Sequence, residues 1–237
     1  MKKMFICAMM LFVTMASYGF TFETGTGYHT QYVFRGQRLI DSPALTPFVT
    51  IGGEHVELKV TNVYNMDNKD FYKSEYQLTF KTEIEKVNLD VGFLRHDIAS
   101  SGIDTNEFFV KAAWNAKWKP FIAVYFDVKK GSGKFIQGGL ERQFKAGKNV
   151  VAFGGRLSYL IDNGYMGLNT VGQEFTGAYN GELYLSSKFN ISKHFIVEPM
   201  LGYTFPLSSE SKGAIQRLSV NGEENTLYGG ITLSTAF

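Results

Sequence analysis

The residue types that most often carry out chemistry are scattered along this chain. Its four histidines, His29, His55, His96 and His194, lie far apart and lack the spacing of a metal site. No Gly-x-Ser-x-Gly nucleophile motif occurs, and the only cysteine is Cys7. We therefore expect no cofactor, no bound metal and no enzymatic activity. A hydrolase site assembled from distant strands stays open as an alternative, because such sites leave no local motif.

The first residues have the pattern of a signal peptide. Lys2 and Lys3 precede an apolar run over residues 4–16, and small residues follow at 17–19. We expect a signal peptide over 1–19 and one mature domain over 20–237, which then lacks cysteine. Removing the two lysines lowers the basic count from 24 to 22, equal to the 22 acidic residues. A net charge near zero gives no support to a nucleic-acid partner.

The rest of the chain repeats a pattern of short strands and turns. No later apolar stretch reaches the length of a transmembrane helix. Alternating segments of about ten residues are bounded by turn residues, which is typical of β-strands. We predict twelve strands: 22–34, 44–52, 56–64, 75–81, 87–93, 107–114, 121–128, 135–144, 151–159, 174–189, 195–205 and 227–237. The inward and outward faces over 107–144 stay open, since both faces of 121–140 are apolar or glycine.

In the regular strands one face carries no charged side chain. Phe153, Leu183 and Leu201 lie on that face, whereas Arg156 and Glu182 lie on the other. A charge on the lipid face of a membrane barrel costs about 2 to 4 kcal/mol at the bilayer midplane. The pattern therefore predicts an all-β fold, a single closed antiparallel transmembrane barrel in the bacterial outer membrane. A soluble, exported ligand-binding barrel is the alternative.

The predicted connections alternate in length. Segments 35–43, 65–74 and 94–106 are long and polar, whereas 53–55, 83–86 and 115–119 are short. This alternation is typical of a barrel with long outer loops, short inner turns and both ends in the periplasm. Pro47 and Pro199 fall inside predicted strands, and we expect a bulge or a strand end at each.

The last predicted strand ends on an aromatic residue. Its alternation and its final Phe237 resemble the closing strand of bacterial outer-membrane barrels, whose last residue is part of the signal read by the assembly machinery. The resemblance implies the barrel-assembly machinery, membrane lipid and lipopolysaccharide as partners.

The first predicted hairpin carries the most specific motif. Tyr32-Val33-Phe34-Arg35-Gly36, followed by Pro43-Ala44-Leu45, resembles the first-hairpin motif of the TorF porin family, which implies an outer-membrane barrel with a pore function. From the residues themselves we expect Phe34 to end the lipid face, Arg35 to point into the barrel mouth and Gly36 to relieve the turn. Alternatively, Arg35 is structural and holds a loop or a carboxylate.

The polar face predicts a lumen of mixed charge. The candidate lining residues are Glu23, His29, Arg35, Glu57, Lys59, Glu75, Lys81, Asp90, Arg156, Glu174, Glu182, Lys188 and Glu198. Twelve strands enclose a narrow or a plugged passage. We predict passive diffusion of small hydrophilic solutes or ions with weak cation preference. The alternative is a non-conducting barrel that acts in adhesion or as a scaffold through its outer loops, chiefly 206–226.

Overall fold

The computed structural model describes residues 19–99, 103–168 and 171–237. The predicted signal peptide lies outside the described residues, apart from Gly19, and stays a prediction.

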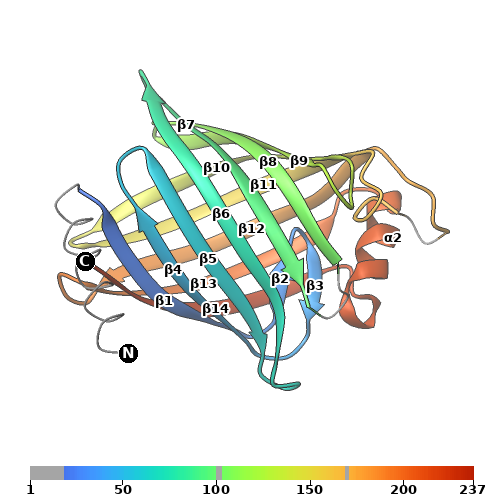
Figure 1. Cartoon of the computed structure of the whole chain (residues 1–237), viewed down its shortest axis with the longest axis horizontal. Coiled ribbons are helices and arrows are strands. Elements are labelled where there is room, and N and C mark those ends of the chain that lie inside the picture. The colour runs from blue at the N-terminus through green and yellow to red at the C-terminus, as the bar shows by residue number, and fades with distance from the viewer. Residues whose placement is uncertain (1–18, 100–102, 169–170) are drawn as a thin grey trace, which may run out of the picture.

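Twelve strands form a closed antiparallel barrel (Figure 1). They are β1 (Thr21–His29), β4 (Ala44–Gly52), β5 (Val56–Asn65), β6 (Asp70–Ile84), β7 (Val87–Ile98), β8 (Ile103–Trp114), β9 (Trp118–Asp127), β10 (Lys134–Ala146), β11 (Asn149–Ile161), β12 (Gly177–Asn190), β13 (Phe195–Pro206) and β14 (Thr226–Ala236). Each strand pairs with its neighbour in this order, and β1 closes the barrel against β14. The predicted fold class and strand number are confirmed.

The apolar face of the wall points outward. Phe153, Leu183 and Leu201 are 39%, 58% and 50% exposed, whereas Glu182 on the opposite face is 4% exposed. Exposed apolar side chains that surround a closed barrel are the surface that hydrocarbon requires. Within the described ranges, no helix is long and apolar enough to cross a membrane.

Both ends of the described chain lie at the end of the barrel that carries the short turns (Figure 1). At the opposite end the strands are longer than predicted. The connection between β5 and β6 is only residues 66–69, and β7 runs to Ile98. The predicted strands ended too early because the prediction required an uncharged outer face. The actual strands continue past the apolar belt, where the outer face carries charges. There Arg95 and Asp97 form an ion pair of 2.7 Å on the exposed surface.

The two prolines interrupt the ladder without a bulge or a strand end, so that prediction was wrong. Pro47 pairs with Thr26 of β1 in unbroken register. On its other side the β4–β5 pairing skips from Leu45 to Phe48 and resumes in the same register. Pro199 behaves likewise between β13 and β12. Each proline thus interrupts the backbone hydrogen bonds to one neighbouring strand, while the strand keeps its direction and register.

The first predicted strand, 22–34, is wrong beyond its eighth residue, His29. β1 ends at His29, and the chain then forms a separate two-stranded sheet from β2 (Tyr32–Phe34) and β3 (Gln37–Ile40). The backbone N–H of Thr30 still donates to the carbonyl of Gly229 on β14, and the side chains of Thr30 and Gln31 donate to the carbonyls of Gly229 and Leu227. The hairpin β2–β3 turns inward and contacts residues of β8 and β12. Phe34 therefore lies inside the barrel and not at the end of the lipid face.

A short helix covers the hairpin. The predicted loop 206–226 contains α2 (Ser209–Leu218) and the 3-10 turn η1 (Val220–Gly222). Ser208 caps α2 together with Ser211 in a capping box. The buried face of α2 includes Ala214 and Ile215, which pack with Phe135, Leu160, Met166 and Tyr179. We did not predict this helix, because its apolar positions span fewer than three turns.

The start of β12 also departs from the prediction. The register shifts between Leu157 and Tyr159, where β11 pairs with β12. A bulge changes which face the following residues take. Tyr179, predicted on the lipid face, is fully buried. Glu174 is exposed and precedes β12, so its assignment to the lumen was wrong.

Candidate functional site

The tip of the hairpin β2–β3 is a two-residue turn formed by Arg35 and Gly36. Both have positive φ, 49° and 84°, which is the conformation of a type I′ hairpin turn. Gly36 is required for a second reason, since a Cβ added there would lie 2.8 Å from the Cβ of Asn180. Arg35 has no such freedom and carries a cost of roughly 1 to 2 kcal/mol for this conformation. Backbone strain of this kind often marks a functional site.

Arg35 is held by Glu107 of β8. Nη1 and Nη2 of Arg35 donate to Oε1 and Oε2 of Glu107, each over 2.6 Å. The two side chains are 8% and 3% exposed. Burial opposes the charge of the guanidinium, but the Glu107 carboxylate and its hydrogen bonds outweigh burial and raise the pKa of Arg35. The tip therefore carries a permanent charge that is paired in a bidentate geometry.

Three aromatic rings surround the guanidinium. Its Cζ lies 5.0 Å from the ring centroid of Phe34, 4.7 Å from that of Tyr125 and 4.5 Å from that of Phe135. Aromatic faces attract a cation and exclude water from it. The Sδ of Met166 lies 3.8 Å from Nη1 and covers a further side.

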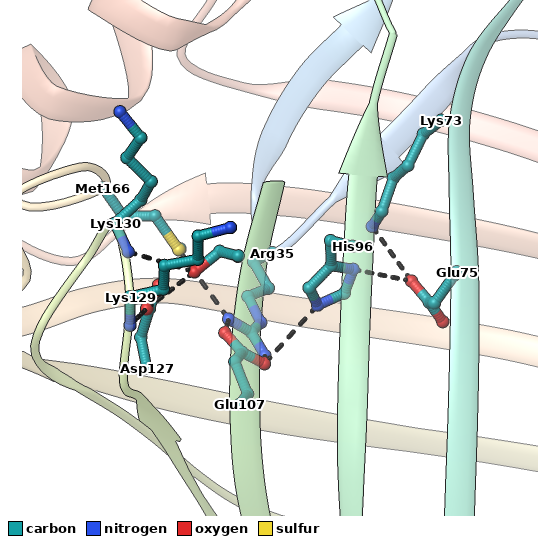
Figure 2. A network of polar contacts seen from close by, with 10 residues as sticks. Arg35, Lys73, Glu75, His96, Glu107, Asp127, Lys129, Lys130 and Met166 are labelled. Carbon is teal, nitrogen blue, oxygen red and sulfur yellow. Dashed lines mark hydrogen bonds and ion pairs between the residues drawn. The ribbon is translucent and has the colours of Figure 1, made fainter. Parts of the chain in front are cut away.

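A second charge pair lies beside the first (Figure 2). Nζ of Lys73 lies 2.9 Å from Oε2 of Glu75 and 3.7 Å from the ring centroid of Phe34. His96 stands between the two carboxylates: Nδ1 is 3.1 Å from Glu75 and Nε2 is 3.5 Å from Glu107. Neither ring nitrogen makes a well-aligned hydrogen bond within the described part of the chain. Figure 2 shows Arg35, Glu107, His96, Glu75 and Lys73 as one row that runs along the wall from β8 to β6.

The outer part of the hairpin is fixed by different contacts. Gln37 donates to the hydroxyl of Tyr179 over 2.7 Å. The backbone N–H of Arg38 donates to Oγ of Ser219, and its side chain donates to the carbonyl of Val220. Ile40 belongs to an apolar cluster with Ala44 and Val63, against which Tyr32 and Tyr72 pack. The outer half of the barrel is therefore filled by the hairpin, α2 and these clusters.

The inner half contains three connected cavities. Their volumes are about 520, 310 and 450 Å³, and all three are lined by Lys111. The 450 Å³ cavity includes Glu54 and His55 of a short turn. A fourth cavity of about 40 Å³ lies on the outer side of the hairpin and shares only Phe34 and Arg35 with the 310 Å³ cavity. The hairpin tip thus separates the inner vestibule from the outer end.

The sequence-predicted site residues are placed as follows. Glu75, Lys81, Asp90, Arg156, Glu182, Glu198 and Arg35 line the cavities. Glu57 forms an ion pair with Lys81, and Nζ of Lys59 lies 4.9 Å from the ring centroid of Phe48. Nε2 of His29 lies 2.9 Å from Oγ1 of Thr46. Glu23 lies opposite Ala236, and Lys188 opposite Val150, near the short turns. Phe237 is exposed beside His194, and Pro43 accepts a bond from Met66.

Sequence reasoning missed several site residues. Glu107 lies in the region 107–144, whose inward and outward faces were left open, and Lys73 was assigned to the loop 65–74. His96 was considered only as a metal ligand. Within the described residues, no group of three or more His, Cys, Asp or Glu side chains could hold a metal ion. Glu107 and Lys111 alternate with the apolar Phe108 and Val110. This alternation was the one sequence signal that could have placed Glu107 on the inner face of β8.

Comparison with known proteins identifies the fold. The NanC porin structure superposes with a TM-score of 0.51 at 12% identity, over 91% of this chain and 98% of that one. The chain has the fold of a bacterial outer-membrane β-barrel. Two further structures score lower: the COG4313 outer-membrane channel of Pseudomonas putida F1 (0.48, 10% identity, 92% and 96% covered) and the outer-membrane phospholipase A of Escherichia coli (0.47, 10% identity, 92% and 90% covered). No protein-family model and no curated protein matches the sequence.

These similarities show the fold alone. At 12% identity the similarity does not decide between a channel and an enzyme. The membrane location agrees with the apolar belt of the barrel wall, and it implies membrane lipid as its surroundings.

Proposed function

We propose that the chain is an outer-membrane channel for small hydrophilic solutes or ions, with its narrowest point at the tip of the hairpin β2–β3. The observation that carries the proposal is the vestibule of about 520, 310 and 450 Å³, which extends from the short turns to Arg35. A barrel that served only as a scaffold would gain stability by filling this volume with side chains. A polar vestibule is instead suited to water and dissolved solutes.

The hairpin is suited to act as a constriction. β2 and β3 pair only with each other and not with the barrel strands. Its tip blocks the passage through a single ion pair between Arg35 and Glu107. The network runs along the inner face of the wall from β8 to β6, and its two cations and two carboxylates exert a local electric field on any solute that passes the hairpin tip.

The channel has a weak preference for cations, because acidic side chains outnumber basic ones in its vestibule. The excess of acidic over basic residues on the predicted polar face included Glu174, which lies outside the barrel. Even without Glu174, the three cavities of the vestibule are lined by seven acidic and five basic side chains: Glu54, Glu75, Glu83, Asp90, Glu141, Glu182 and Glu198 against Arg35, Lys81, Lys111, Lys119 and Arg156. We also propose membership in the TorF porin family, on the motif that forms the hairpin tip, and recognition of Phe237 by the barrel-assembly machinery. Lipopolysaccharide is the proposed partner of the outer surface.

A second candidate function is a non-conducting barrel that binds partners through its outer end. One observation favours it: two buried apolar clusters and α2 fill the outer half. Under this alternative, the exposed charges Glu210, Lys212 and Glu223 near α2 form the contact surface.

Single-channel recording in planar bilayers tests the proposal. His29 pairs directly with Ala44, so residues 30–43 can be replaced by a short Asn-Gly turn that joins β1 to β4. We expect small conductance steps from the intact barrel and much larger steps from the variant without the hairpin. The matched control is Lys59→Gln, which changes a charge on β5 away from the hairpin. Folded protein that gives no steps in either form would establish the non-conducting alternative.

A further inference from the structure

Two cavities of the vestibule share one arc of side chains below the hairpin. The cavities of about 520 and 310 Å³ share five lining residues: Lys111, Tyr125, Gln137, Arg156 and Glu182. These come from five consecutive strands, β8 to β12. A solute that lies between the two cavities is therefore within reach of all five side chains.

The one acidic member of the arc already has its partners. Oε1 of Glu182 accepts from Nη2 of Arg156 over 2.5 Å and from the hydroxyl of Tyr228 over 2.8 Å. Its charge is compensated within the wall, and the side chain is almost fully buried. Glu182 therefore orients Arg156 and has little capacity left for a solute cation.

The other four members have donors to spare. Lys111 forms no ion pair or hydrogen bond with any side chain in the described ranges, and its Nζ lies 5.8 Å from the ring centroid of Phe121. Among those same residues, the amide of Gln137 and the hydroxyl of Tyr125 have no hydrogen-bond partner either. Arg156 donates only through Nη2, and its side chain is 36% exposed to the cavity.

The geometry points to a binding site for a small hydroxylated solute with one carboxylate. Lys111 and Arg156 supply the positive charge, while Gln137 and Tyr125 supply hydrogen bonds to hydroxyl groups. A single negative charge fits best, since Glu141 and Glu198 line the same 520 Å³ cavity and repel a second one. Asp90 lies opposite Lys111 in the β7–β8 register but forms no ion pair with it, which leaves the ammonium available.

The site can be reached while the hairpin is docked. The 450 Å³ cavity joins Lys111 to residues Glu54 and His55 in a short turn. A solute therefore enters from the end that carries both termini, without crossing the constriction. The inference deepens the proposed channel function by naming its solute class, but equilibrium binding does not require conduction.

Calorimetric titration of the purified, folded barrel in uncharged detergent tests this site. The probes are gluconate, glucose and glucosamine, which are similar in size and differ in charge. We expect gluconate to bind at least about tenfold more tightly than the other two, because a charge-assisted hydrogen bond contributes about that factor. Lys111→Gln should weaken gluconate about tenfold, and Lys111→Arg should preserve binding. The matched control Lys59→Gln, on β5 and outside the three cavities, should leave it unchanged.

Three results would overturn the inference: equal binding of the three probes, no binding of gluconate, or equal weakening by Lys59→Gln and Lys111→Gln. Heat-modifiable migration in gels shows that each variant is folded. A barrel that binds gluconate but gives no conductance overturns the channel and keeps the site. A barrel that conducts and treats the three probes alike overturns the site and keeps the channel.

Discussion

Replacing Glu107 with glutamine removes the charge that holds the hairpin tip in place. Arg35 would then remain 8% exposed without a carboxylate partner. Leaving one member of a buried ion pair unpaired costs about 3 to 5 kcal/mol. The hairpin has no ladder bonds to the barrel wall, so this cost is relieved by undocking the hairpin and not by unfolding the barrel. At the lower limit, the undocked population rises by about 100-fold.

Trypsin added to reconstituted vesicles measures that population. Arg35 and Arg38 are cleavage sites within the hairpin, and cleavage of a transiently open segment follows the open population when opening is fast. We expect Glu107→Gln to speed cleavage at these two positions by about 100-fold and to increase open time in bilayer recordings. The barrel strands should stay intact.

The matched control is Glu57→Gln, which breaks the ion pair with Lys81 near the short turns and leaves the hairpin contacts unchanged. It should leave the cleavage rate at Arg35 close to that of the unmodified chain. If Glu107→Gln protects the hairpin as well as the original residue does, the ion pair is not what docks it. The constriction would then have to depend on the outer contacts alone.

Three further predictions concern the turn, the wall and the chain end. Gly36→Ala should increase hairpin cleavage by about tenfold or more, because alanine disfavours the positive φ at this position and its Cβ would lie too close to Asn180. The control Gly147→Ala also has a positive φ, but open space surrounds its Cβ, and it should leave hairpin cleavage unchanged. Leu183→Arg should lower the free energy of folding in lipid vesicles by about 2 to 4 kcal/mol, as measured by urea titration, whereas Ser186→Arg faces the vestibule and should cost less. Deletion of Phe237 should reduce outer-membrane assembly in cells and leave refolding in detergent unchanged; equal loss in both assays would contradict an assembly role.

The barrel wall was predictable because hydrocarbon imposes a rule on every second residue. Where a strand crosses the bilayer, as at Phe153 and Leu201, a charge on the outer face is costly and the alternation is therefore strict. That rule fixed the number of strands and the faces of most of them. It failed where strands extend beyond the bilayer, since a pair such as Arg95 and Asp97 carries no such cost there.

The contents of the barrel were not predictable by the same rule. Tyr32 and Phe34 continue the alternation of β1, so a period of two could not distinguish a longer wall strand from a hairpin that turns inward. At Tyr179 a single bulge reversed the face, and a bulge leaves no clear mark in the sequence. The partner of Arg35 was equally hidden, because Glu107 is 72 residues away and pairs with it only once the barrel has closed.

The way the hairpin is attached explains how a rigid wall can contain a displaceable element. The wall is closed, so each of its strands is held on both sides by a ladder, and none can leave without breaking two. The hairpin has one ladder, between β2 and β3, and it moves as a unit when it undocks. Its tip depends on charge pairs, which contribute little net stability once desolvation is counted but strongly favour one geometry. Docking is therefore specific without being strong, and a change of a few kcal/mol at Glu107 or Gly36 alters the constriction while the wall persists.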